Sequence, residues 1–215
     1  MTLPFNKKHA PSQLQTWIRA SEPTADRSWR DLPAEVKAAL RERLHEDQRG
    51  LCCYCYVTVR CDPDSHIEHV EPRSPDNRFD WQNLALACDG GNKHGDGEHC
   101  DHAKGQQRLE SVHPYRAPVI RFVRLRGTGA LALTSEAARH DIDGVLKLNA
   151  RRLQSLRRSV LQSALADLTQ PRRRRASWTP QQLDKSLAEL QRRPTPLDYQ
   201  PLLQAWIERR LRKRT

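Results

Sequence analysis

The chain has 215 residues, enough for one domain of ordinary size or for a small core with helical additions. Only 37% of the residues are hydrophobic and the mean hydropathy is −0.84, so a bound metal would help to stabilise so thin a core. No run approaches the ~18 apolar residues of a membrane span, and no apolar signal segment opens the sequence, so we expect a cytoplasmic protein that does not contact a membrane.

The net charge of +11 is unevenly distributed. Residues 1–148 contain 21 basic and 21 acidic residues, whereas residues 149–215 contain 16 basic and 5 acidic residues and so carry the whole excess. A basic segment attached to a neutral one indicates a polyanionic partner. Its most concentrated patch, and the expected nucleic-acid contact, is Arg172, Arg173, Arg174 and Arg175. The alternative is a solvated helical face.

Along the chain, helices are expected first near residues 11–20 and 32–48, where apolar residues recur at helical spacing. Residues 54–60 and 66–70 are typical of two short strands joined through a turn at 62–64. Residues 83–88 fit a helix or a strand equally well. A further helix is expected to begin at Asp101.

The C-terminal half predicts a hairpin followed by helices. Residues 118–125 and 130–134 resemble strands around a glycine turn. Thr134 or Ser135 is expected to cap a short helix, and Asn149 a longer one with a leucine stripe. Two more helices are expected to start at Thr179-Pro180, a capping-box pattern, and at Thr195-Pro196. These expectations give an α+β fold in three parts: a helical segment (1–50), a central unit (51–110) and a hairpin plus basic helices (111–215).

All six cysteines and five of the nine histidines lie between residues 51 and 105. Close cysteine spacing in a cytosolic protein indicates metal ligands more often than disulfides. Two pairs, Cys52 with Cys55 and Cys88 with Cys100, predict a structural zinc site of four thiolates. His94 or His99 remains an alternative to one of the cysteines. Cys53 and Cys61 are expected to be free buried thiols.

A second group of residues predicts catalysis. In the short strand-like run His66-Ile67-Glu68-His69, a period of two places His66 and Glu68 on one face and His69 on the other. A hard divalent cation prefers oxygen ligands, which suits Glu68 and also Asp101. An imidazole titrates near neutral pH, so His69 is a candidate general base for activating water.

The order of these residues resembles the HNH (His-Asn-His) nuclease motif and, more closely, the PtuB-type HNH nucleases of bacterial Septu anti-phage defence and related retron systems. The resemblance covers about a quarter of the chain and rests on residues 52–55, 66–69, Pro72 with Ser74, 81–84 and 100–105. It implies a ββα-metal core with strands near 54–60 and 66–70 and a helix from Asp101.

The resemblance also implies roles. His69 takes the place of the general base, Glu68 that of a metal ligand, and Asn83 that of the central asparagine that holds the loop and the histidine. Asp101 takes the place of the second metal ligand, where the family more often has His or Asn. This departure favours Mg²⁺ or Mn²⁺ as the catalytic ion. His66, His102 and Lys104 are possible assisting residues for metal or phosphate.

In the Septu family the nuclease works with an ABC-type ATPase, and this chain has no P-loop motif of its own. The expected function is therefore metal-dependent hydrolysis of nucleic acid, with DNA the first candidate, as the effector of such a defence system. One alternative is an HNH nuclease that acts on RNA such as tRNA. Another is a zinc-stabilised nucleic-acid-binding module without hydrolysis, for which Glu68, His69 and Asp101 have no use.

Overall fold

The structure is a computed structural model that describes residues 4–20, 27–63, 65–91, 97–166 and 178–212. Within these ranges the α-helices are α1 (Ser12–Ala20), α2 (Ala34–Asp47), α3 (Cys100–Lys104), α4 (Arg151–Ala166), α5 (Pro180–Arg192) and α6 (Gln200–Arg212). The strands are β1 (His66–His69), β2 (Leu84–Ala87), β3 (Val123–Leu125) and β4 (Leu131–Leu133). The strands form two antiparallel pairs, β1–β2 and β3–β4. The predicted α+β class is confirmed.

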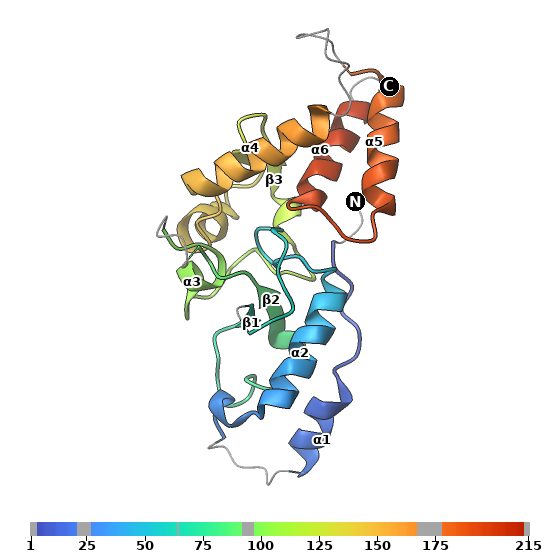
Figure 1. Cartoon of the computed structure of the whole chain (residues 1–215). Coiled ribbons are helices and arrows are strands. Elements are labelled where there is room, and N and C mark those ends of the chain that lie inside the picture. The colour runs from blue at the N-terminus through green and yellow to red at the C-terminus, as the bar shows by residue number, and fades with distance from the viewer. Residues whose placement is uncertain (1–3, 21–26, 64, 92–96, 167–177, 213–215) are drawn as a thin grey trace.

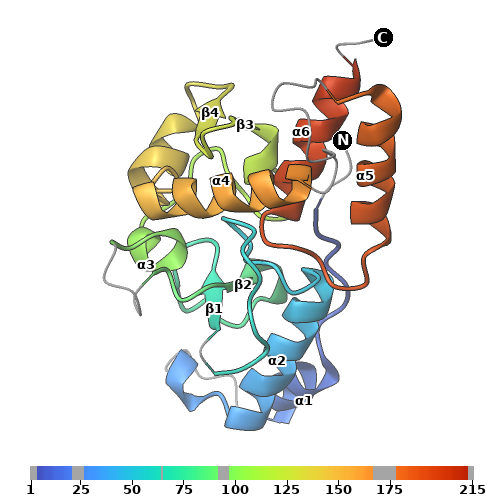
Figure 2. The ribbon, with the colours of Figure 1, turned by 45° about the horizontal axis from the view of Figure 1, so that its top comes forward.

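The first sheet lies in the middle of the molecule. Helices α1 and α2 are at one end, α4, α5 and α6 are at the other, and β1, β2 and α3 lie between them (Figure 1). A second view shows α4 running across the top of this central region, with α5 and α6 side by side (Figure 2). Among the described helices, none combines the length and apolar character that crossing a bilayer requires.

Helix α2 forms where the sequence predicts it and buries Val36, Leu40 and Leu44. Its C-terminal neighbour, Gln48, is fully buried and satisfies its amide on both sides. The amide nitrogen of Gln48 donates to the carbonyls of Leu51 and Leu86 at 2.8 Å each, and its amide oxygen accepts from Leu86 N at 2.7 Å. A buried amide with all these bonds made fixes the end of α2 against strand β2.

The predicted pairing of residues 54–60 with residues 66–70 is wrong. Strand β1 pairs instead with β2, with His66 opposite Ala87 and His69 opposite Leu84. Residues 53–55 form a turn, and the segment 54–60 contributes only one isolated bridge, between Leu51 and Thr58. All four residues of β2 are buried, which explains why this apolar run could not be assigned to strand or helix from periodicity. The order strand, strand, helix (β1, β2, α3) results.

The predicted hairpin is present as β3–β4, but the first strand is shorter than expected, because Val119–Arg121 forms a 3-10 helix. The start of α5 follows the sequence prediction. Thr179 caps α5 in a capping box with Gln182. The other predicted starts need correction. The helix expected after Thr134 or Ser135 is a π-helical segment, His140–Val145, without a side-chain cap. Helix α6 starts at Gln200, beyond the predicted Thr195-Pro196.

Asn149 was expected to cap α4, but its side chain bonds elsewhere. The side-chain oxygen of Asn149 accepts from Leu131 N at 2.9 Å, and its nitrogen donates to Leu131 O and to Asp143 at 2.9 Å each. The fully buried Arg157 adds a second tie, with bonds to the carbonyls of Gly129 (2.7 Å) and Leu148 (2.8 Å). Both side chains therefore fasten helix α4 and its approach to the β3–β4 hairpin, above the central sheet.

Candidate metal centres and active site

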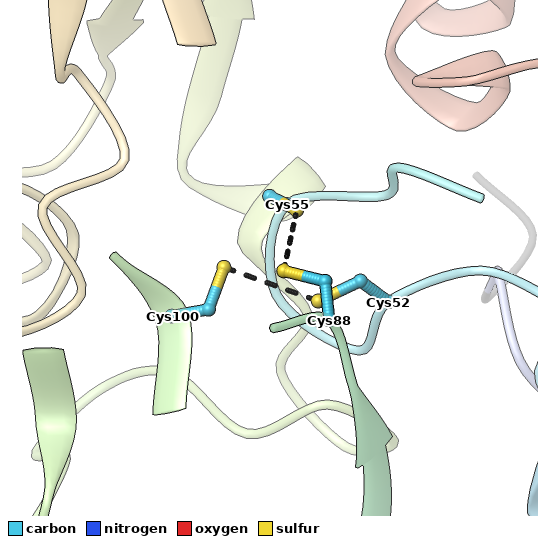
Figure 3. A group of neighbouring side chains, drawn as sticks. All are labelled: Cys52, Cys55, Cys88 and Cys100. Atoms are coloured by element: carbon cyan, nitrogen blue, oxygen red, sulfur yellow. Dashed lines mark hydrogen bonds between the residues drawn. The ribbon is translucent and has the colours of Figure 1, made fainter. Parts of the chain in front are cut away.

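The four predicted zinc ligands converge. Their sulfur atoms, carried by the 52–55 turn, by the end of β2 and by the first residue of α3, all lie within 4.8 Å of one another. Figure 3 shows the four side chains pointing toward a common centre. The sulfur of Cys52 is 3.9 Å from that of Cys100, and the sulfur of Cys55 is 3.8 Å from that of Cys88.

These separations fit a metal ion. Zn–S bonds of about 2.3 Å in a tetrahedral site place the sulfurs about 3.8 Å apart. All four side chains are buried, and burial raises the pKa of the Cys100 thiol well above its ordinary range. Cysteines bind a metal ion as thiolates, so binding releases the protons of those thiols that are still protonated. The cluster is suited to a structural zinc ion.

The alternatives to the four cysteines are resolved in part. His99 lies beside the cluster, with its Nδ1 3.2 Å from the sulfur of Cys100 and 4.0 Å from that of Cys88, and so can hydrogen-bond to the thiolates from outside. His94 lies outside the described residues. Cys53 is a buried free thiol as expected, whereas Cys61 is exposed, contrary to the prediction.

A second group of possible ligands joins β1 to α3. One ligand atom each of His66, Asp101 and His102 lies within 4.8 Å of the others. His66 Nδ1 is 2.9 Å from Asp101 Oδ2, a hydrogen bond that raises the pKa of His66. The rings of His66 and His102 are 4.6 Å apart between centroids. Buried Asp101 Oδ1 and His102 Nε2 have no hydrogen-bond partner among the described residues.

Unpartnered buried polar atoms are uncommon in proteins and need an explanation. Here two of them belong to a carboxylate and an imidazole that face the same small group. One carboxylate and two imidazoles form a donor set that suits a divalent transition metal. The observed atoms therefore fit a cation, and the group combines Asp101 with the two histidines that the sequence marked as assisting residues.

Glu68, the other predicted ligand, is placed differently. Its carboxylate is 2.9 Å from the ammonium of Lys104 and accepts a hydrogen bond of 2.9 Å from Tyr54 Oη. Lys104, predicted as a phosphate or metal assistant, is itself buried and also donates to the carbonyl of His69 at 3.0 Å. Burial raises the pKa of Glu68, and Lys104 opposes this. Glu68 and Lys104 thus form a buried pair that joins β1 to α3.

His69, the predicted general base, is the last residue of β1, and its side chain is buried. Its Nε2 is 2.9 Å from the carbonyl oxygen of Arg78. A carbonyl only accepts, so Nε2 carries the proton and Nδ1 presents a lone pair. Burial lowers the pKa of His69 to about 4, so the ring is neutral near pH 7. The ring of Trp29 packs against it in a T-shaped contact, with centroids 4.6 Å apart at 84°.

Two asparagines brace the segment that follows His69. Asn83, the predicted central asparagine, accepts from Glu71 N (2.7 Å) and donates to Glu71 O (3.2 Å). Asn77 accepts from Ser74 N (2.8 Å) and donates to Pro72 O (2.9 Å), which closes the turn before the Arg78 carbonyl. Asn77 was not among the predicted site residues, although an asparagine in a Ser-Pro-Asp-Asn segment is a recognised turn signal.

The predicted basic patch, residues 172–175, lies outside the described residues. In the described part of the basic segment, the last turn of α6 carries Arg209, Arg210 and Arg212. Partial burial lowers the pKa of Arg209, and the positive charges of Arg124 in β3 and of Arg212 contribute to this.

Comparison with known proteins gives one partial match. A protein of Vibrio cholerae serotype O1 biovar El Tor, named "Retron Vc95 putative HNH endonuclease", is 30% identical over 94 residues. The alignment covers 40% of this chain and 45% of that protein, so the chain spans less than half of the length of its curated relative. No protein-family model matches the chain, and no solved structure matches it. The similarity is distant and partial.

Proposed function

We propose that the chain is a metal-dependent endonuclease of the HNH class that hydrolyses phosphodiester bonds in nucleic acid. Its partial similarity to a protein named as an HNH endonuclease supports this class. The elements β1, β2 and α3 follow one another as strand, strand and helix, the order of a ββα unit, although the segment 54–60 that the resemblance implied as a strand is not one of them. The observation that carries the proposal is His69, a neutral imidazole whose tautomer is set by the Arg78 carbonyl.

In this proposal His69 Nδ1 takes a proton from a water molecule as the water oxygen forms a bond to phosphorus. The P–O3′ bond breaks, the 3′ oxygen acquires a proton from solvent, and the products carry a 5′-phosphate and a 3′-hydroxyl. Because the Nε2–H group keeps donating its hydrogen bond to the Arg78 carbonyl, the imidazole is held in one orientation during this transfer. Its low pKa keeps the acceptor nitrogen free of a proton over the neutral range.

For the catalytic ion we propose His66, Asp101 and His102 as ligands, in place of the Glu68 and Asp101 pair predicted from the resemblance. The unpartnered Asp101 Oδ1 and His102 Nε2 support this set, and the bonds of Glu68 to Lys104 and Tyr54 argue against Glu68. When bound, a divalent ion would polarise the phosphate. Two imidazoles favour Mn²⁺ over Mg²⁺.

For the biological setting, the Septu-type motif and the retron in the name of the relative support a role as effector of a bacterial anti-phage system in the cytoplasm. We propose an ABC-type ATPase as its partner and DNA as its first substrate. The clustered arginines at the end of α6 offer an electrostatic contact to phosphates that carries little sequence information.

The test is cleavage of supercoiled plasmid and of structured RNA by the zinc-loaded protein, with Mn²⁺, Mg²⁺ or EDTA, with and without the ATPase. We expect cleavage that needs a divalent ion and is lost in Asp101→Ala and His102→Ala. His140→Ala, which removes an exposed histidine outside the group, is the control. Binding without cleavage in every condition would support the rival zinc-stabilised binding module instead.

A further inference from the structure

The acceptor nitrogen of His69 is not open in the free protein. Arg73 Nη2 lies 3.4 Å from His69 Nδ1, four residues along the chain. Since His69 Nδ1 carries the lone pair and a guanidinium has only donors, this contact is a weak hydrogen bond from arginine to the proton-accepting atom. The atom that would take the proton from water is thus covered by a cation.

The guanidinium of Arg73 is held by one further contact. It lies over the ring of Trp29, 5.7 Å from the centroid, and Trp29 in turn makes a T-shaped contact with His69. Within the described part of the chain, Arg73 forms no salt bridge. Arginine in an exposed position with no carboxylate partner is suited to an incoming anion.

The loop that carries Arg73 is well fixed. The Asn77 side chain closes the turn onto Ser74 N and Pro72 O, and the same turn presents the Arg78 carbonyl to His69 Nε2. One short loop therefore supplies partners for both nitrogens of the imidazole. The Arg78 contact is strong and structural, whereas the Arg73 contact is long and comes from a side chain that can move.

From this geometry we propose that Arg73 binds a phosphate of the nucleic-acid substrate, and that in doing so it leaves His69 Nδ1 and opens it to the attacking water. A guanidinium forms shorter and stronger hydrogen bonds to a phosphate oxygen than to an imidazole nitrogen. Arg73 therefore binds the phosphate in preference to His69 Nδ1. The same movement brings the phosphate next to the base. Arg73 is then a positioning residue for the phosphate. This inference rests on the proposed nuclease function and adds a substrate-binding residue to it.

The kinetic test compares Arg73→Gln and Arg73→Lys with wild type at saturating Mn²⁺. We expect Arg73→Gln to lower kcat/KM roughly 10- to 100-fold, the effect of losing one hydrogen bond to a charged group. Arg73→Lys should recover part of the lost kcat/KM, because lysine keeps the positive charge but lacks the two parallel N–H donors of the guanidinium. Arg30→Gln, an exposed arginine beside Trp29, removes the same charge and should stay within twofold of wild type.

A second measurement does not depend on cleavage. Nitrogen-15 NMR of the histidine side chains reports the His69 Nδ1 resonance as the dinucleotide thymidylyl-thymidine is added. In wild type the resonance should move as Arg73 leaves, whereas in Arg73→Gln it should start near the free value and move less. If wild type cleaves nothing yet its resonance moves, the proposed function fails and the phosphate site stands. Three results would overturn the inference. The His69 Nδ1 resonance of wild type does not move, the kcat/KM of Arg73→Gln stays within twofold of wild type, or Arg30→Gln lowers kcat/KM as much as Arg73→Gln does.

Discussion

Replacing Lys104 by methionine tests how Glu68 is used. In the structure the Lys104 ammonium is 2.9 Å from the Glu68 carboxylate, and the two side chains are only 1% and 9% exposed. Removing one partner of a buried ion pair costs about 3–5 kcal/mol, because the remaining charge is left unpaired. For a chain of this size each kcal/mol lowers Tm by about 2–4 °C, so Lys104→Met should unfold roughly 6–20 °C below wild type.

The assay is thermal unfolding of the zinc-loaded protein by circular dichroism. The double variant Glu68→Gln with Lys104→Met should recover much of the loss, because neither charge is then buried alone. Lys185→Met is the control: Lys185 and Glu189 are 3.9 Å apart and 77% and 61% exposed, so its loss should stay below about 1 kcal/mol. The reasoning is refuted if Lys104→Met matches this control, or if Glu68→Gln keeps its stability but loses Mn²⁺ binding in calorimetry, as a metal ligand would.

Three further outcomes follow from the same structure. Removing zinc with a strong chelator, or replacing Cys55 by serine, should unfold the central region, since a structural zinc supplies ~10–16 kcal/mol in small zinc-finger peptides; metal analysis with circular dichroism checks this, and a folded zinc-free protein would contradict it. For His69, the folded pKa of about 4 lies below the ordinary 6.5, so the unfolded chain binds the proton more tightly, and stability should fall as pH drops from 6.5 to 4 by up to about 3 kcal/mol. Urea unfolding at pH 7 and pH 5 should show a smaller loss in His69→Gln, and equal losses would count against a buried neutral imidazole. Gly129→Ala should destabilise the hairpin strongly, because a Cβ there would lie 1.9 Å from the carbonyl oxygen of Gln154 and the backbone has φ +83°; an unchanged Tm would show that α4 can shift away.

The four-cysteine cluster could be predicted from sequence because the spacing of its ligands is local. Two cysteine pairs at ligand spacing define a site whatever fold brings them together. The helices α2 and α5 were predictable for a similar reason, since apolar spacing and a capping box are properties of consecutive residues. In these cases short-range physics and the final fold agree.

The sheet pairing could not be predicted, because an alternating pattern indicates a strand but does not identify the strand that pairs with it. Residues 54–60 alternate as a strand does, but Cys52 and Cys55 bend this segment into the cysteine cluster. The true partner, β2, is apolar at every position because both of its faces are buried, so it has no alternation to detect. The pairing of His66 with Ala87 depends on contacts between segments far apart in the chain.

The ligand group around Asp101 could not be predicted from the sequence for a different reason. The resemblance directed attention to Glu68 because it stands next to His69. Which carboxylate stays free for a cation depends on Lys104, whose side chain reaches Glu68 from α3. That competition is decided by three-dimensional packing, and the unpartnered atoms of Asp101 and His102 became visible only there. Asn149 is a second example, because its side chain bonds to Leu131, 18 residues away, and not to the helix that it was expected to cap.

The most direct test of the nuclease proposal is the cleavage rate of His69→Ala relative to wild type, in Mn²⁺, on the substrate that wild type cuts best. Zinc content and Tm should be measured on the same samples, so that a folding defect is recognised. Loss of a general base predicts a rate lower by about 10²–10⁴-fold, with nucleic-acid binding retained. A His69→Ala protein that is folded and cleaves as fast as wild type would contradict the proposed role of His69 and, with it, the proposed active site.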